Sequence, residues 1–107
     1  MKQALKPLAG CKDMPNNSSI LVNIYNDEDF ILYRNENGDL MLSSSLCPHQ
    51  NEPLDHGHFQ DSQVICRRHH LIFDLKTGEC LNACGYTLQT LPVVIRDGVI
   101  CALYWED

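Results

Sequence analysis

Two short motifs near the middle of this 107-residue chain combine cysteine with histidine. One residue separates Cys47 from His49, two residues separate Cys66 from His69, and residues 50–65 lie between the motifs. Thiolate sulfur and imidazole nitrogen are donors that zinc and iron–sulfur centres use. The pattern therefore predicts a metal centre held by four side chains from two separate segments.

The stretch that contains the motifs, 46–74, is typical of loops rather than of continuous sheet. It holds Pro48, Pro53, Gly57 and all five histidines of the chain. Short apolar pieces at 63–66 and 71–74 predict strands that carry loops at their ends. Lys76-Thr77-Gly78 predicts a turn.

Strand patterns flank this stretch on both sides, and no segment has a convincing helical period. The predicted strands are 19–25, 29–34 and 39–43 before it, and 90–95 and 98–104 after it. Polar turns at 26–28, 35–38 and 96–98 connect neighbouring strands, and Asn37-Gly38 suits a tight hairpin. We therefore expect an antiparallel β domain of roughly eight or more strands with a loop-rich insertion.

The order Cys-x-His, sixteen residues, Cys-x-x-His resembles the signature of the Rieske iron–sulfur proteins. The resemblance includes residues 47–50, 53–54, 57, 59, 72–74 and 77–78, and the final hairpin around Asp97-Gly98. It implies an all-β Rieske fold: an antiparallel β-sandwich or small barrel with a two-loop cluster-binding subdomain at about 45–75. A chain of this length is expected to form a single domain, 1–107.

The resemblance implies one 2Fe-2S cluster, with Cys47 and Cys66 on one iron and His49 and His69 on the other. Two thiolates and two neutral imidazoles leave the oxidised cluster formally neutral, and reduction makes it a monoanion. Adding an electron to a neutral centre costs less than adding one to a dianion. Histidine ligation therefore raises the reduction potential toward about −150 to +300 mV.

Within that range we expect a potential within roughly 100 mV of the low end. High-potential Rieske proteins have a second cysteine in each loop, joined by a disulfide, and Ser and Tyr hydroxyls near the cluster. The corresponding positions here are Glu52, Arg68, Leu71 and Phe73. None of these residues can supply those features.

Low-potential Rieske proteins of this size resemble ferredoxins of bacterial multicomponent oxygenases that degrade aromatic hydrocarbons, most closely the toluene monooxygenase type. The resemblance implies an electron carrier, not an enzyme, between an NADH-dependent flavin reductase and a terminal oxygenase. The alternative is the Rieske small subunit of an assimilatory nitrite reductase. A terminal oxygenase is not expected, because 107 residues leave no room for a mononuclear iron domain.

Composition favours protein partners over nucleic acid or membrane. The formal net charge is −6, and the eight Lys and Arg residues are scattered apart from Arg67-Arg68. No apolar run resembles a signal peptide or a membrane span. We expect a cytoplasmic monomer whose docking rim is formed by Pro48, Gln50, Arg68 and His70 around the histidines.

Two other arrangements of the site stay open at this point. Zinc uses the same four ligand types, although zinc fingers usually pair Cys with Cys and His with His. His70 could replace His69 as a ligand, whereas the motif spacing favours His69 and leaves His70 at the rim. We interpret His56 and His58 as surface residues.

The remaining chemistry-bearing residues are interpreted as structural. Without a secretory signal, Cys80 and Cys84 are expected to be free and at least half-buried thiols, with Cys11 and Cys101 as small apolar residues. Asp74 and Glu52 have no companion nucleophile, so neither is expected to be catalytic. Core packing is expected for the aromatic residues Phe30, Tyr33, Phe73 and Tyr104.

Overall fold

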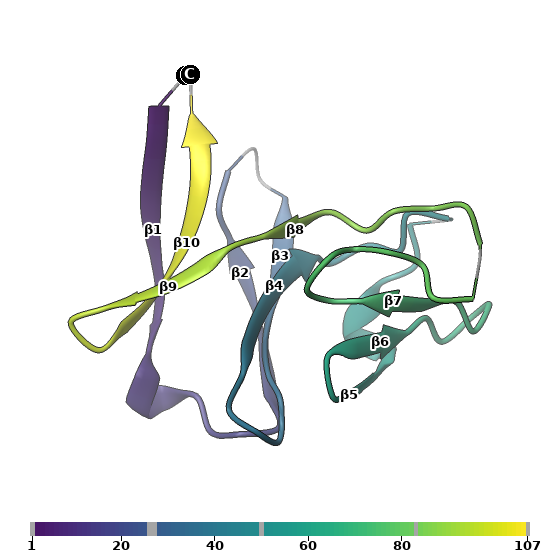
Figure 1. Ribbon diagram of the computed structural model, residues 1–107, viewed down its shortest axis with the longest axis horizontal. Coiled ribbons are helices and arrows are strands. Elements are labelled where there is room, and N and C mark those ends of the chain that lie inside the picture. The colour runs from purple at the N-terminus through teal and green to yellow at the C-terminus, as the bar shows by residue number, and fades with distance from the viewer. Residues whose placement is uncertain (1, 26–27, 50, 83, 107) are drawn as a thin grey trace.

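The computed structural model describes residues 2–25, 28–49, 51–82 and 84–106. In these ranges, the strands form three antiparallel sheets, in the orders β1-β10-β9, β2-β3-β4-β8 and β5-β6-β7 (Figure 1). Two single-turn 3-10 helices lie between strands. The helical turns are η1 (Cys11–Asp13) and η2 (Leu54–His56). The strands are β1 (Lys2–Gly10), β2 (Ser18–Asn23), β3 (Asp29–Arg34), β4 (Leu40–Ser44), β5 (His58–Gln60), β6 (Gln63–Ile65), β7 (Ile72–Asp74), β8 (Thr90–Leu91), β9 (Val93–Arg96) and β10 (Val99–Glu106). The all-β prediction is confirmed.

The hairpins on either side of β3 form as predicted, and local turn chemistry accounts for the second one. β3 pairs antiparallel with both β2 and β4. In the β3–β4 turn the buried Asn35 Oδ1 accepts hydrogen bonds from the N–H groups of Asn37 (3.0 Å) and Asp39 (2.9 Å). Gly38 adopts a φ of 85°, a left-handed conformation that glycine takes without steric cost. Residues 26 and 27 of the first predicted turn lie outside the described residues.

The predicted strand 90–95 is two strands that belong to different sheets. β8 pairs with β4, whereas β9 pairs with β10, and Pro92 lies between them. Proline has no N–H to donate, so it interrupts the ladder where the chain changes sheets. The final hairpin is confirmed, and both Asp97 and Gly98 have positive φ at its turn.

Strand β1 was not predicted from the sequence. It pairs along its length with β10, from the opposite end of the chain, and the register shifts between Pro7 and Ala9. It is an edge strand with mostly exposed or half-buried side chains. A proline and three charged or polar residues obscure the alternation that identifies a half-buried strand. β5 was likewise missed.

Strand β3 separates two hydrophobic cores. Phe30 and Leu32 point into a far core between the β2-β3-β4-β8 and β1-β10-β9 sheets, which also contains Met14, Ile24, Leu42, Ile100 and Ala102. Ile31 and Tyr33 point the other way, into a site core with Met41, Cys47, Leu54, Val64, Cys66, Phe73, Leu75 and Leu88. Because both faces of the strand are buried, four consecutive side chains are apolar. Figure 1 shows the three sheets side by side in this order.

The core role predicted for Phe30, Tyr33 and Phe73 is confirmed, since all three are buried, and Tyr104 packs against the far core. Tyr33 also contacts Phe59 of β5, with ring centroids 5.0 Å apart. This pair joins the central sheet to the β5-β6-β7 sheet.

Across the residues that the structure describes, no helix has the length and apolar character needed to cross a membrane.

The environment of Tyr33 predicts a loss of stability at alkaline pH. Burial raises the pKa of Tyr33 above its ordinary 10.0, and the carboxylates of Glu36 and Asp61 raise it further. The unfolded chain therefore ionises first, so this stabilisation is complete below about pH 10 and is lost as the pH rises through the native pKa. We expect Tyr33→Phe to flatten the fall in the free energy of unfolding above about pH 10, measured by urea titrations. An unchanged fall in the variant would contradict this assignment.

Candidate metal centre

The first cysteine–histidine loop, residues 47–52, is closed by two backbone hydrogen bonds. The Cys47 N–H donates to the Glu52 carbonyl, and the Asn51 N–H donates to the Cys47 carbonyl, both at 2.8 Å. Cys47 is buried, and His49 is half-buried. Residue 50, predicted as part of the docking rim, lies outside the described residues.

The second loop, residues 66–71, repeats the same backbone pattern. The Cys66 N–H donates to the Leu71 carbonyl at 2.8 Å, and the His70 N–H donates to the Cys66 carbonyl at 2.9 Å. Cys66 is fully buried, and His69 is exposed. Each loop thus buries its cysteine in the site core and holds its histidine nearer the surface.

The two loops also share a left-handed residue at equivalent positions. Asn51 has a φ of 56° and His70 a φ of 57°, and each donates the hydrogen bond to the cysteine carbonyl of its own loop. Asparagine tolerates this conformation, whereas histidine does so less readily than glycine. The backbone at residue 70 therefore favours glycine, although this chain has histidine there.

The two predicted histidine ligands lie together. Their ring centroids are 4.7 Å apart, with the rings nearly perpendicular. Among the described residues, His49 Nδ1 is the buried side-chain nitrogen or oxygen that lacks a hydrogen-bond partner. A buried ring nitrogen without a partner is costly, and coordination to a metal would satisfy it. The residues present therefore fit a metal group held between the two loops.

Zinc and a two-iron cluster would divide the four predicted ligands differently. Among the described residues, no three Cys, His, Asp or Glu side chains converge closely enough to hold one metal ion. A tetrahedral zinc needs four ligands around a single point. A two-iron cluster divides them, two ligands to each iron. The contact between the His49 and His69 rings suits two imidazoles on one iron.

The neighbouring histidines lie on another surface. His70 lines a shallow hollow of about 510 Å³ together with His56 and His58, whereas His69 contacts His49. His56 and His58 are exposed, as predicted. The geometry thus brings His69, not His70, to His49.

An ion pair connects the two loops on their outer side. Arg68 Nη1 lies 3.6 Å from Glu52 Oε2, and Arg68 is largely exposed. These are the positions at which high-potential relatives were expected to have bridging cysteines. A partly exposed ion pair contributes at most about 1 kcal/mol, less than a covalent bridge does. Glu52 thus has an ion-pair partner on the other loop.

The prediction that Cys80 and Cys84 are free thiols is wrong: they form a disulfide, with Cα atoms 5.9 Å apart. Both side chains are half-buried, as expected. Isolated bridges join Phe73 to Cys80 and Glu79 to Thr87, so the chain folds back on itself and brings the two sulfurs together. The spacing alone did not reveal this local reversal. Cys101 is buried and Cys11 half-buried, and neither forms a disulfide.

The disulfide lies in a third segment, residues 79–88, that packs beside both loops. Asp74 begins the preceding turn, where its Oδ1 accepts hydrogen bonds from the Lys76 and Thr77 N–H groups. Gly78 has a φ of 82°, and a Cβ there would lie 2.0 Å from the Leu88 carbonyl oxygen. Only glycine fits this turn, and the Asp74 side chain closes it.

Sequence reasoning missed two residues of the third segment that reach the loops. Asn82 Oδ1 accepts a hydrogen bond from the Ile72 N–H (3.2 Å), and Asn82 Nδ2 donates to the His70 carbonyl (3.0 Å). The Tyr86 ring contacts the His49 ring at 5.0 Å between centroids. Neither residue belongs to a motif, and only the return of the chain beside the loops identifies them.

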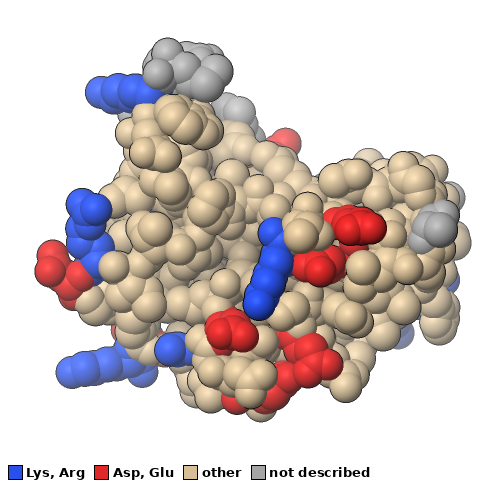
Figure 2. All heavy atoms as spheres, in the orientation of Figure 1, with Lys and Arg blue, Asp and Glu red and all other residues tan. Residues whose placement is uncertain are grey.

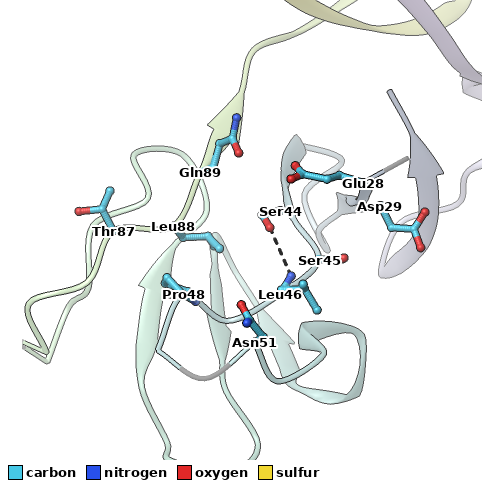
Figure 3. Close-up of a pocket in the computed structure, with 10 residues that line it drawn as sticks. All are labelled: Glu28, Asp29, Ser44, Ser45, Leu46, Pro48, Asn51, Thr87, Leu88 and Gln89. Atoms are coloured by element: carbon cyan, nitrogen blue, oxygen red, sulfur yellow. Dashed lines mark hydrogen bonds between the residues drawn. The ribbon is translucent and has the colours of Figure 1, made fainter. Parts of the chain in front are cut away.

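A cavity of about 480 Å³ opens beside the first loop (Figure 3). Its lining residues lie around the start of β3, along the chain from the end of β4 into the first loop, and around residue 88. They are Glu28, Asp29, Ser44, Ser45, Leu46, Pro48, Asn51, Thr87, Leu88 and Gln89. Figure 2 shows acidic side chains gathered over the middle of the drawn face, and most basic ones over the β1-β10-β9 end. The acidic side chains of this face thus lie over the middle of the molecule, whereas the second loop exposes Arg67 and Arg68.

Comparison with known proteins identifies the family. The model of the Rieske [2Fe-2S] domain matches residues 5–92. The chain belongs to this family, and its cofactor is a Rieske-type 2Fe-2S cluster.

Particular relatives are ferredoxins and a reductase subunit. The ferredoxin component of the alkene monooxygenase system of Xanthobacter autotrophicus is 29% identical over 73 residues, which are 67% of this chain and 59% of that protein. The match thus spans less than two thirds of that relative. The Sphingomonas yanoikuyae B1 ferredoxin is 26% identical, with a TM-score of 0.77 over 90% of this chain and 94% of that one. An NADH-dependent nitrite reductase small subunit from Mycobacterium tuberculosis has a TM-score of 0.87 over 100% of both chains at 15% identity, a likeness of fold.

The left-handed conformation of His70 predicts a stabilising substitution. His70→Gly should raise the free energy of unfolding by roughly 0.5–1 kcal/mol, because relief of the strained φ exceeds the added entropy of the unfolded chain. The measurement is the urea midpoint at matched iron content. His58→Gly is the control, since His58 lies in β5 without a positive φ and should lose stability. A less stable His70→Gly protein would contradict the assignment.

Proposed function

We propose that this chain is an electron carrier whose cluster is held by Cys47 and Cys66 on one iron and by His49 and His69 on the other. The observation that carries the proposal is the unpaired, buried His49 Nδ1 beside the His69 ring, between two loops of equivalent backbone geometry. When bound, the cluster supplies a centre that accepts and releases one electron.

The residues around the proposed ligands support reversible reduction at low potential. Both cysteines are buried in the site core, which excludes water from the sulfur side. Leu71 and Phe73 offer no hydroxyl to hydrogen-bond the sulfurs, and Phe73 is fully buried. Fewer donors stabilise the reduced, more negative cluster less, so the potential stays toward the low end of the histidine-ligated range.

Electron exchange would take place at the histidine end. His69 is exposed and His49 half-buried, while both cysteines are inaccessible. The docking rim proposed for this end includes the exposed Arg68 and the half-buried Pro48. His70, its other described member, is exposed beside His56 and His58. An imidazole edge at the protein surface shortens the electron-transfer path to a partner protein. Fast, weak association with that partner suits an electron carrier.

We further propose that the chain passes electrons from an NADH-dependent flavin reductase to a terminal oxygenase, as a carrier and not as a catalyst. The resemblance to an oxygenase-system ferredoxin supports this assignment. We also propose that residues 1–107 form one domain, with the cluster-binding subdomain at about 45–75. The protein would be monomeric and cytoplasmic. The second candidate is the small subunit of a nitrite reductase, a class of protein with the same fold.

Paired histidine variants test the proposed ligands. After anaerobic reconstitution, the wild-type chain and His70→Ala should hold about two irons and two sulfides. Both should give one reversible one-electron transition, within roughly 100 mV of the low end of the histidine-ligated range. His69→Ala should lose this transition and the Rieske EPR signal. Loss in His70→Ala with retention in His69→Ala would overturn the ligand assignment.

Purification of the tagged chain from its native cells tests the partner. Co-purification with a diiron hydroxylase and a flavin reductase is the expected result. A stable complex with a siroheme-containing reductase subunit would replace the oxygenase assignment with the second candidate. Cross-linking before lysis captures the weak association expected of a carrier.

A further inference from the structure

We propose that Tyr86 is a positioning residue for the histidine end of the cluster: its ring holds the His49 imidazole in place and covers it from water. The inference rests on the proposed function, because it assigns Tyr86 a role toward the cluster. It adds a residue that belongs to neither cysteine–histidine motif.

The first observation is the set of ring contacts around His49. The Tyr86 centroid lies 5.0 Å from that of His49 with the planes at 62°, and the His69 centroid lies 4.7 Å away with the planes at 87°. Edge-to-face contacts at these separations are favourable and directional. The orientation of His49 is therefore constrained by a ring from the second loop and by a ring from the third segment.

The second observation is that the third segment is braced independently of the cluster. The Cys80–Cys84 disulfide closes its first part, and the Leu88 N–H donates to the Gly78 carbonyl at its far end (2.8 Å). Asn82 ties it to the second loop through the His70 carbonyl. Tyr86 thus lies between a disulfide and a backbone hydrogen bond that tie the described part of the segment to its surroundings, and a ligand whose neighbours are held in place keeps its geometry between redox states.

The third observation separates the ring of Tyr86 from its hydroxyl. Tyr86 is 41% exposed, and its contact with His49 is made by the ring. A tyrosine kept at the surface for its ring alone can be replaced by phenylalanine, but not by an aliphatic side chain.

Removal of the ring has a predictable electrostatic effect. Water would reach the imidazole side of the cluster, and water stabilises the more highly charged state. Since reduction converts the formally neutral centre to a monoanion, the midpoint potential should rise. A less constrained imidazole should also change the nitrogen hyperfine couplings, which depend on how the ring is oriented at the iron.

The experiment compares four reconstituted full-length proteins: wild type, Tyr86→Phe, Tyr86→Leu and Trp105→Leu. Trp105 is the matched control, since it is 62% exposed on β10 and Figure 1 places that strand at the opposite end of the molecule from β5–β7. The measurements are the midpoint potential and the pulsed-EPR nitrogen couplings of the reduced cluster. Tyr86→Leu should show a raised potential and changed couplings, whereas Tyr86→Phe and Trp105→Leu should match the wild type.

Each alternative result has a defined meaning. A Tyr86→Leu protein with wild-type potential and couplings overturns the inference, as does an equal shift in Tyr86→Phe. If Tyr86→Leu fails to fold, Tyr86→Trp, which keeps an aromatic ring, must retain the wild-type couplings for the inference to stand. Failure of the wild type to take up iron and sulfide would refute the proposed function instead, so the two failures are distinguishable.

Discussion

In each cysteine–histidine loop, the cysteine N–H donates to the carbonyl five residues later, and the residue before that carbonyl returns a hydrogen bond to the cysteine carbonyl. This pair of bonds fixes where the cysteine sulfur and the histidine ring can point. Because both loops have it, the site presents two equivalent sulfur–nitrogen pairs. A Rieske centre takes one sulfur from each loop on one iron and one ring nitrogen from each loop on the other, so both loops must present the same pair of ligands.

The rest of the fold holds the two loops at a constant separation. Strand β3 contributes alternate side chains to two cores, so the sheet that supports the loops is fixed on both faces. The Tyr33–Phe59 contact joins this sheet to the sheet that carries the second loop. The Arg68–Glu52 ion pair and Asn82 then connect loop to loop and loop to third segment. Rigid support lowers the reorganisation that accompanies a change of cluster charge.

Local signals account for what could be predicted from the sequence. The Asn-Gly turn before β4 and the Asp-Gly turn before β10 are determined by residues that accept positive φ, so both hairpins were correctly located. Strand β1 was missed because its partner β10 lies at the other end of the chain. The Cys80–Cys84 disulfide, Asn82 and Tyr86 depend on how the third segment returns beside the loops. The ligand motifs are local in sequence, but the contacts that orient the ligands are not.

A crystal structure of the reconstituted protein, with anomalous scattering recorded at the iron absorption edge, tests the central claim most directly. The account predicts two irons between the loops. One should be bonded to the Sγ atoms of Cys47 and Cys66, and the other to Nδ1 of His49 and a ring nitrogen of His69. A single metal ion bound by all four side chains, or an iron bonded to His70, would contradict it.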